Sequence, residues 1–248
     1  MIKFFRKIRY NLMEQNKTGK YLKYALGEIL LVMIGILLAL QVNNWNQERK
    51  NFEKEKYYLK SIKSSIQLSQ EEFNRVINDA ELISSSADTL FILIAQNEVE
   101  QLKGVFLDSL LYGAGDYSMI SLNDGGIQEI LNTGSLDIIR DDQIRIHLAS
   151  WNERMHKIRK YEGETEMTSH EYNKYIMQFL DVKRFISEDM AMEGIVIPNK
   201  RKQLLRGNTL TNYLAKISGI HNSMYEMYTE EKAVMDSLEL LIDNYLKQ

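Results

Sequence analysis

The sequence predicts an all-α fold, in which a single N-terminal transmembrane helix continues into an elongated periplasmic antiparallel helical bundle. Three observations support this fold class. An apolar run occupies residues 22–42, two later segments repeat apolar residues at alternating spacings of three and four, and no proline occurs before Pro198. Because such spacings place side chains on one face of an α-helix, both segments are predicted to be long amphipathic helices.

The apolar run from Leu22 to Val42 predicts a membrane span. At about 1.5 Å per residue it would form a helix of about 31 Å, close to the ~30 Å hydrocarbon core of a bilayer. Twelve of its 21 residues are Leu, Ile or Val. Each of these favours insertion by about 0.3–0.6 kcal/mol, whereas one off-centre carboxylate such as Glu28 costs about 3 kcal/mol or less. The part from Ile29 to Leu40 is apolar on every face, unlike a typical helix of a soluble protein.

The charges on either side of the span predict its orientation. Residues 1–23 contain seven of the 31 basic residues and one of the 34 acidic residues. The chain after position 23 therefore contains 24 basic and 33 acidic residues. Because cytoplasmic segments next to a span carry excess Lys and Arg, we expect a bacterial inner-membrane protein with a cytoplasmic N-terminus and a periplasmic C-terminal domain. A cleaved signal peptide is the alternative, but the apolar run exceeds a typical signal sequence and no small-x-small cleavage site precedes Asn43.

These features divide the chain into three predicted parts. Residues 1–21 form a cytoplasmic basic segment, residues 22–42 the transmembrane helix and residues 43–248 one periplasmic helical bundle domain. The N-terminal segment is either an amphipathic helix in the headgroup layer or a positive flank that only fixes the topology. Trp45 is expected at the far membrane interface, where indole rings are favoured.

Two apolar series predict the long helices of the bundle. The first predicts one helix from Leu22 to about Gln96, and the second predicts a C-terminal helix that packs against it in antiparallel fashion. A dimeric coiled coil is the alternative use of the same two series. The first series consists of Leu59, Ile62, Ile66, Ser69, Phe73, Val76, Ala80, Ile83, Ala87, Leu90 and Ile94. The second series consists of Leu210, Leu214, Ile217, His221, Met224, Tyr228, Glu231, Met235, Leu238, Ile242 and Tyr245.

Shorter elements are predicted between these helices from turn and capping residues. They are a helix over residues 99–111 that closes at Gly113 and Gly115, a helix capped within residues 121–123 that reaches Leu131, a helix that begins at Asp141–Asp142 and passes Trp151, a helix capped by Thr168–Ser169 that reaches about Met192, and a loop over residues 194–208.

The sequence predicts no catalytic, metal or cofactor site. It contains no cysteine, its four histidines lack zinc-ligand spacing, and its glycines fit no phosphate-binding loop. Glu162, Glu166 and His170 share one helical face and could be partial metal ligands, but a solvated polar face is the favoured interpretation. His221 and Glu231 interrupt the last apolar series, where we expect exposure to solvent rather than a role in register or pH sensing. The acidic C-terminal part argues against nucleic acid as a partner.

Three residues of the span are candidates for helix contact. Glu28 is ionisable within an apolar helix, and such groups often pair with a neighbour or face a protein interface. Gly35 and Ala39 form a small-xxx-small pattern that lets two helix backbones approach closely. The expected partners are therefore the lipid bilayer together with a protein partner or a second copy of the chain.

The segments FFRKIR, KYLKYALGEILLVMIGILLALQVNNWN and LNTGSLDIIRDDQIRIHL resemble an uncharacterised family of single-pass envelope proteins common in Bacteroidetes, classed as a domain of unknown function. The resemblance is strong over the first 50 or so residues and weak in the middle of the chain. It implies an inner-membrane protein with a helical periplasmic domain, and it carries no catalytic residues.

Two functions are compatible with this sequence. The first is a membrane-anchored scaffold or accessory subunit of an envelope protein complex, without catalytic activity. The second is a periplasmic ligand sensor that signals through its transmembrane helix to a partner, because residues 1–21 are too short to hold an output domain of their own.

Overall fold

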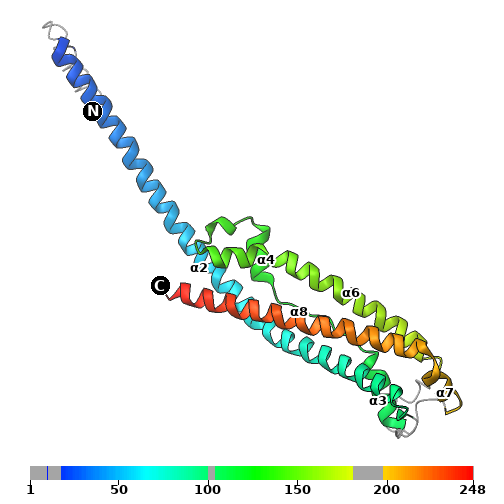
Figure 1. Cartoon of the computed structure of the whole chain (residues 1–248). Helices are drawn as coiled ribbons and strands as arrows, with labels where there is room; N and C mark the ends of the chain where they lie inside the picture. Colours follow the sequence, from blue (N-terminus) through cyan, green and yellow to red (C-terminus); the bar gives the residue numbers. More distant parts are fainter. Residues whose placement is uncertain (1–9, 11–17, 100–103, 181–197, 248) are drawn as a thin grey trace. The chain divides into compact units, whose positions relative to one another are not determined.

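The computed structural model describes residues 10, 18–99, 104–180 and 198–247, and the regular elements within these residues are all helices (Figure 1). The chain divides into two compact units, Met1–Lys56 and Tyr57–Gln248, called unit 1 and unit 2 below. Most of the predicted N-terminal amphipathic segment lies outside the described residues. The predicted end, near Met192, of the helix expected to begin at Thr168–Ser169 also lies outside them.

Helix α2 spans Thr18–Ala95 and therefore contributes residues to both units. Its bounds confirm the prediction of one helix that ends near residue 96. In unit 1, the large apolar side chains from Leu26 to Val42 are 47–64% exposed. Of the helices that the structure describes, α2 alone is long and apolar enough to cross a membrane.

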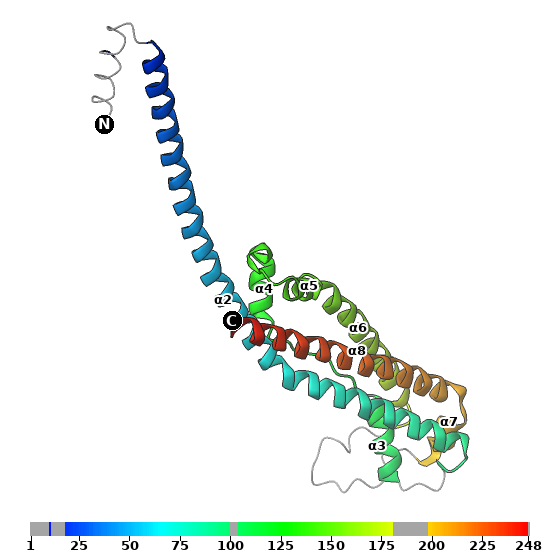
Figure 2. The same ribbon diagram turned by 60° about the vertical axis from the view of Figure 1, so that its left-hand side comes forward.

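Unit 2 is built on three long helices, namely α2 from Tyr57 onward, α6 (Trp151–Ile176) and α8 (Asn208–Leu246) (Figure 2). Helix α8 runs antiparallel to both of the others. Successive contacts show this for α2, where Lys63 pairs with Asp243 and Gln70 with Glu239. The contacts of α6 with α8 show the same direction, because Arg154 pairs with Glu231 and Tyr172 packs on Tyr213.

The apolar series identified in the sequence form the seams between these helices. In each series ten of the eleven positions are buried, and the exceptions, Ile94 and Tyr245, are partly buried. The core they build consists of two clusters. The first apolar cluster includes Phe73, Trp151 and Met235, and the second includes Leu90 and Leu214.

Short helices complete unit 2. They are α3 (Gly104–Ala114), α4 (Gly125–Asn132), the 3-10 turn η2 (Leu136–Ile138), α5 (Asp142–Ala149) and α7 (Pro198–Arg206). Asp141 caps α5 as predicted, because its carboxylate accepts hydrogen bonds from the backbone N–H groups of Gln143 (2.9 Å) and Ile144 (3.0 Å). Gly134, with φ of +64°, ends the turn after α4 where the sequence predicts a break.

Five details differ from the prediction. Helix α3 continues through Gly113, the first of the two glycines predicted to close it, and ends at Ala114, directly before Gly115. The residue before α4 is Asp124, and its side chain makes no capping bond. Thr168 and Ser169 lie inside the continuous helix α6 and do not cap a new one, while the helix expected to pass Trp151 breaks at Ser150. Within the predicted loop over residues 194–208, residues 198–206 form α7.

Candidate functional site

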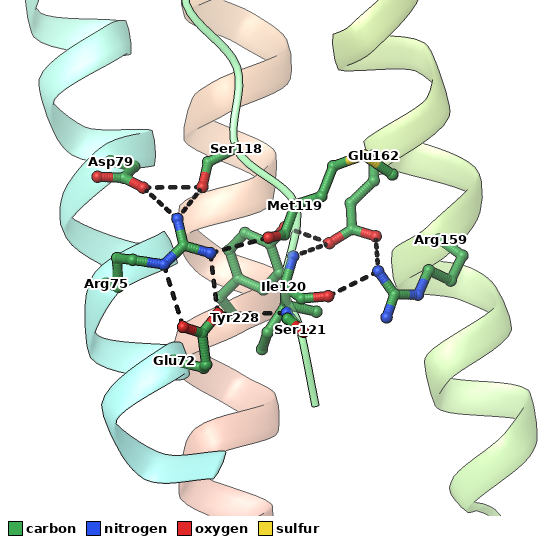
Figure 3. Close-up of polar contacts among 10 residues, drawn as sticks. All are labelled: Glu72, Arg75, Asp79, Ser118, Met119, Ile120, Ser121, Arg159, Glu162 and Tyr228. Carbon is green, nitrogen blue, oxygen red and sulfur yellow. Dashed lines mark hydrogen bonds and ion pairs between the residues drawn. The ribbon is translucent and has the colours of Figure 1, made fainter. Parts of the chain in front are cut away.

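The most distinctive feature of unit 2 is an extended segment, Gly115–Asp124, which we call the strap. It contains no helix or strand and connects α3 with α4. Figure 3 shows it running between α2 and α6, with α8 behind it. Backbone N–H and C=O groups need hydrogen-bond partners when they are removed from water. Side chains of the neighbouring helices provide these partners.

Arg75 of α2 is the main contact on one side of the strap. Its guanidinium donates to the carbonyl of Met119 (2.9 Å) and to the hydroxyl of Ser118 (2.8 Å), and it pairs with Asp79 (2.8 Å). It also pairs with Glu72 (2.9 Å), whose carboxylate accepts the N–H of Ser121 at 3.3 Å. The hydrogen bond from Arg75 and, as a smaller cause, the hydrogen bond from the Ser121 N–H lower the pKa of the Glu72 carboxyl.

Glu162 of α6 is the main contact on the opposite side, and its side chain is fully buried. One carboxylate oxygen accepts both the N–H of Ile120 and the hydroxyl of Tyr228, each at 2.7 Å. The other oxygen pairs with Arg159 at 2.8 Å, and Arg159 in turn donates to the carbonyl of Ile120 at 2.8 Å. Burial, and then the charge of Glu162, raise the pKa of Tyr228.

The two ends of the strap are held in the same manner. At its start, the carbonyl of Gly115 accepts from Ser169 (2.6 Å) and from Asn173 (2.7 Å) of α6. At its end, the hydroxyl of Ser69 accepts the N–H of Asn123 (3.1 Å), and the indole N–H of Trp151 donates to Asp124 (3.1 Å). Side chains therefore fix the path of the strap through its main chain along most of its length.

A layer of buried polar side chains separates the two apolar clusters. On α6 it lies between Ile158 of the first cluster and Tyr172 of the second, and on α8 it lies between Ile217 and Met224. We call it the polar layer, and its members are Glu162, Thr165, Thr168, Ser169 and His221. Polar groups at this depth must be hydrogen bonded or they destabilise the fold.

His221 and Glu231 are buried, 4% and 5% exposed, so the expectation that they face solvent is wrong. Both lie on the face of α8 that packs into the bundle. Arg154 of α6 pairs with Glu231 at 2.8 Å, while burial raises the pKa of the Glu231 carboxyl. Burial also lowers the pKa of His221.

The predicted face of Glu162, Glu166 and His170 is not the solvated surface that was expected, because Glu162 is buried within it. His170 instead stacks edge-on against Tyr117 of the strap, with ring centroids 5.7 Å apart. Among the residues that the structure describes, no three His, Asp or Glu side chains are grouped as metal ligands.

A cleft of about 340 Å³ lies beside the start of the strap. It is lined by residues from α2, α3 and the strap, namely Asp79, Leu82, Ile83, Ser86, Gly113, Asp116 and Tyr117. The cleft thus presents the carboxylate of Asp116, an aromatic ring and aliphatic side chains, together with Asp79, which is already paired with Arg75. This combination suits a small molecule with a positive charge and an apolar part.

The candidate residues of the span lie on the exposed apolar part of α2. Gly35 and Ala39 are exposed, Glu28 is half-buried, and no atom lies within 4 Å of a Cβ built on Gly35. Glu28 also lines a groove of about 280 Å³ with Ala25, Ile29 and Val32. Whether these residues contact a partner stays a prediction.

Comparison with protein families finds a match over more than half of the chain. Residues 28–180 match the family of unknown function DUF6090. The chain belongs to this family. The match covers most of α2 and all of α3, the strap, α4, α5 and α6, and so includes the elements that hold the strap on both sides. No curated protein and no solved structure matches the chain.

Proposed function

We propose that this DUF6090 protein is a membrane-anchored helical scaffold or accessory subunit of an envelope protein complex. The observation that carries the proposal is the surface of α2 from Leu26 to Val42, where large apolar side chains are exposed on every face. Such a surface is unfavourable in water and requires lipid or a partner helix to cover it.

The proposed topology places the N-terminus in the cytoplasm and unit 2 in the periplasm. It rests on the net charge of +6 in residues 1–23 and of −9 in the remainder of the chain, because positive flanks remain on the cytoplasmic side. Fusing a periplasm-active reporter after residue 247 tests it, and activity of a cytoplasm-specific reporter at the same site would contradict it.

A binding role is supported by how unit 2 uses the polar side chains around the strap. Those of Figure 3 bind the main chain of the strap or one another. They hold the helices in place, as expected of a rigid surface that other proteins recognise. No catalytic activity is part of the proposal.

Extraction in mild detergent followed by native mass spectrometry tests the scaffold role. We expect the chain to appear with a second copy or with a co-purifying protein, and Glu28→Leu or Gly35→Leu to reduce that species. Leu37→Phe is the control, because it adds bulk about 200° around the helix from Gly35. Free monomer alone, with no co-purifying protein, would contradict the proposal.

A ligand-sensing role is the second candidate, and the cleft beside the strap favours it. In this role a small cationic ligand would bind between Asp79 and Asp116 and change how the strap is held. Thermal unfolding of the full chain with a panel of amines tests the idea. If no amine raises the unfolding temperature, or if Asp116→Asn leaves a stabilisation unchanged, the sensing role is wrong.

A further inference from the structure

The polar layer contains one buried nitrogen with an open hydrogen-bonding valence. Nδ1 of His221 lies 2.9 Å from the carbonyl oxygen of Ile217, one turn earlier in α8. A carbonyl oxygen can only accept, so Nδ1 must carry the proton of the neutral ring. Nε2 then has a bare lone pair, and it makes no hydrogen bond to any group that the structure describes.

Each element of unit 2 that borders the polar layer carries charged or titratable groups, and the charge of Asp116 is one that acts on His221. The strap contributes Asp116, which is exposed and whose charge acts on the imidazole. Helix α6 contributes Glu162, already bonded to Ile120, Tyr228 and Arg159, together with the half-buried Glu166 and the exposed His170. Helix α2 contributes Asp79, held by Arg75 and Ser118, and α8 contributes Tyr228 and Glu231, held by Glu162 and Arg154.

A proton on Nε2 changes what the polar layer must accommodate. The ring becomes a cation, and Nε2–H becomes a donor that needs an acceptor. The carboxylates of Glu162, Asp79 and Glu231 are engaged by hydrogen bonds or ion pairs, whereas Asp116 faces solvent and uses one oxygen to accept the N–H of Tyr117. The carboxylate best able to receive the new donor is therefore on the strap.

We propose that His221 is an acid-operated latch, in which protonation of Nε2 opens the polar layer towards Asp116 and loosens the strap while both apolar clusters remain folded.

The strap is the element expected to open first, because of the kind of contacts that hold it. Its main chain is held by polar side chains, and Ile120 is its one fully buried apolar side chain. The long helices, in contrast, are held by the apolar seams, whose burial does not depend on pH. Local opening takes place where few apolar contacts resist it.

Hydrogen exchange of the full chain in detergent micelles, read by mass spectrometry at a series of pH values from 7.5 to 5, tests the latch. The chain is compared at each pH with His221→Gln, which is polar but does not titrate, and with His221→Met, which is apolar and of similar size. Because the chain and each variant are compared at the same pH, the pH dependence of the intrinsic amide exchange rate does not affect the difference between them. Circular dichroism at neutral pH establishes that each variant is folded.

We expect peptides that cover residues 115–124 to open more as the pH falls, by up to about tenfold per pH unit for a single proton. Peptides from the middle of α8 should stay protected. Both His221 variants should lose the pH dependence, and Asp116→Asn should move the midpoint to lower pH because a carboxylate that favours the cation is gone. An equal acid response in the chain and in both His221 variants, or none in the chain, would overturn the proposal.

Discussion

Removing the carboxylate of Glu162 in α6 should destabilise unit 2 more than the loss of any other side chain that holds the strap. In Glu162→Ala, the N–H of Ile120 and the hydroxyl of Tyr228 lose the acceptor that each contacts at 2.7 Å. A buried donor without a partner costs about 1–3 kcal/mol, so two of them should lower the free energy of unfolding by about 2–6 kcal/mol.

Glu162→Gln is the matched variant that separates these hydrogen bonds from the ion pair. The amide keeps one oxygen, which can accept from both Ile120 and Tyr228. Its NH2 group can only donate, so the ion pair and the hydrogen bond with Arg159 are lost. Because the Arg159 side chain is 46% exposed, we expect that loss to cost at most about 1 kcal/mol.

Thermal unfolding of the full chain in detergent, followed by circular dichroism, measures both variants. For a domain of this size each 1 kcal/mol corresponds to roughly 2–4 °C, so Tm should fall by roughly 4–24 °C in Glu162→Ala and by less than about 4 °C in Glu162→Gln. If the two variants lose the same stability, or if Glu162→Ala loses less than about 1 kcal/mol, the buried carboxylate is not what holds the strap.

Three further changes probe other contacts. Gly126→Ala should destabilise the chain by about 1–3 kcal/mol in thermal unfolding, because its Cβ would lie 2.6 Å from backbone atoms of Ser61, and Gly125→Ala, with nothing within 4 Å, should have almost no effect. Asp141→Ala should cost about 1 kcal/mol through loss of the α5 cap, and an unchanged Tm would show that α5 needs no cap. Since burial raises the folded-state pKa of Glu231, its contribution to stability is present below the unfolded pKa and is lost as pH rises through the folded pKa. Unfolding from pH 4 to 7 should therefore show a flatter pH dependence in Glu231→Gln, and equal slopes would contradict this assignment.

The long helices could be predicted from sequence because their signal is repeated many times. Eleven positions at spacings of three and four fix which face of α2 or α8 is buried, and a single polar residue does not disturb the pattern. The same reasoning failed for His221 and Glu231. A periodic pattern shows that a position faces the bundle, but it does not show the partner of a polar side chain there. That partner is Arg154 of α6 for Glu231 and the carbonyl of Ile217 in α8 for His221.

The ends of α6 were misjudged because Thr168 and Ser169 have the composition of a helix cap. Their hydroxyls serve other bonds in the structure. Thr168 donates to the carbonyl of Glu164 within α6 (2.8 Å), and Ser169 donates to Gly115 (2.6 Å). Local sequence could not distinguish these uses, since the partner of Ser169 lies 54 residues away.

The contacts that hold the strap could not be predicted from sequence, because they join residues that are far apart. One signal was available. Ser69 is the polar exception in the first apolar series, and Ser65 precedes it by one turn. Their hydroxyls accept the N–H groups of Asn123 (3.1 Å) and Gly126 (3.0 Å), so they mark the place where the strap meets α4.

The polar contacts of unit 2 also explain how its three long helices are aligned. The seam between α2 and α8 is mainly apolar, with pairs such as Lys63–Asp243 at its rim, and an apolar seam alone tolerates a shift in register. Between α6 and α8, the buried pairs Arg154–Glu231 and Glu162–Tyr228 permit one register, because a slide by one turn would leave buried charges unpaired. The strap, bonded to Arg75 on one side and to Glu162 on the other, links this register to α2. A segment without secondary structure of its own thus adds a polar link between α2 and α6 to the apolar seams that hold the long helices together.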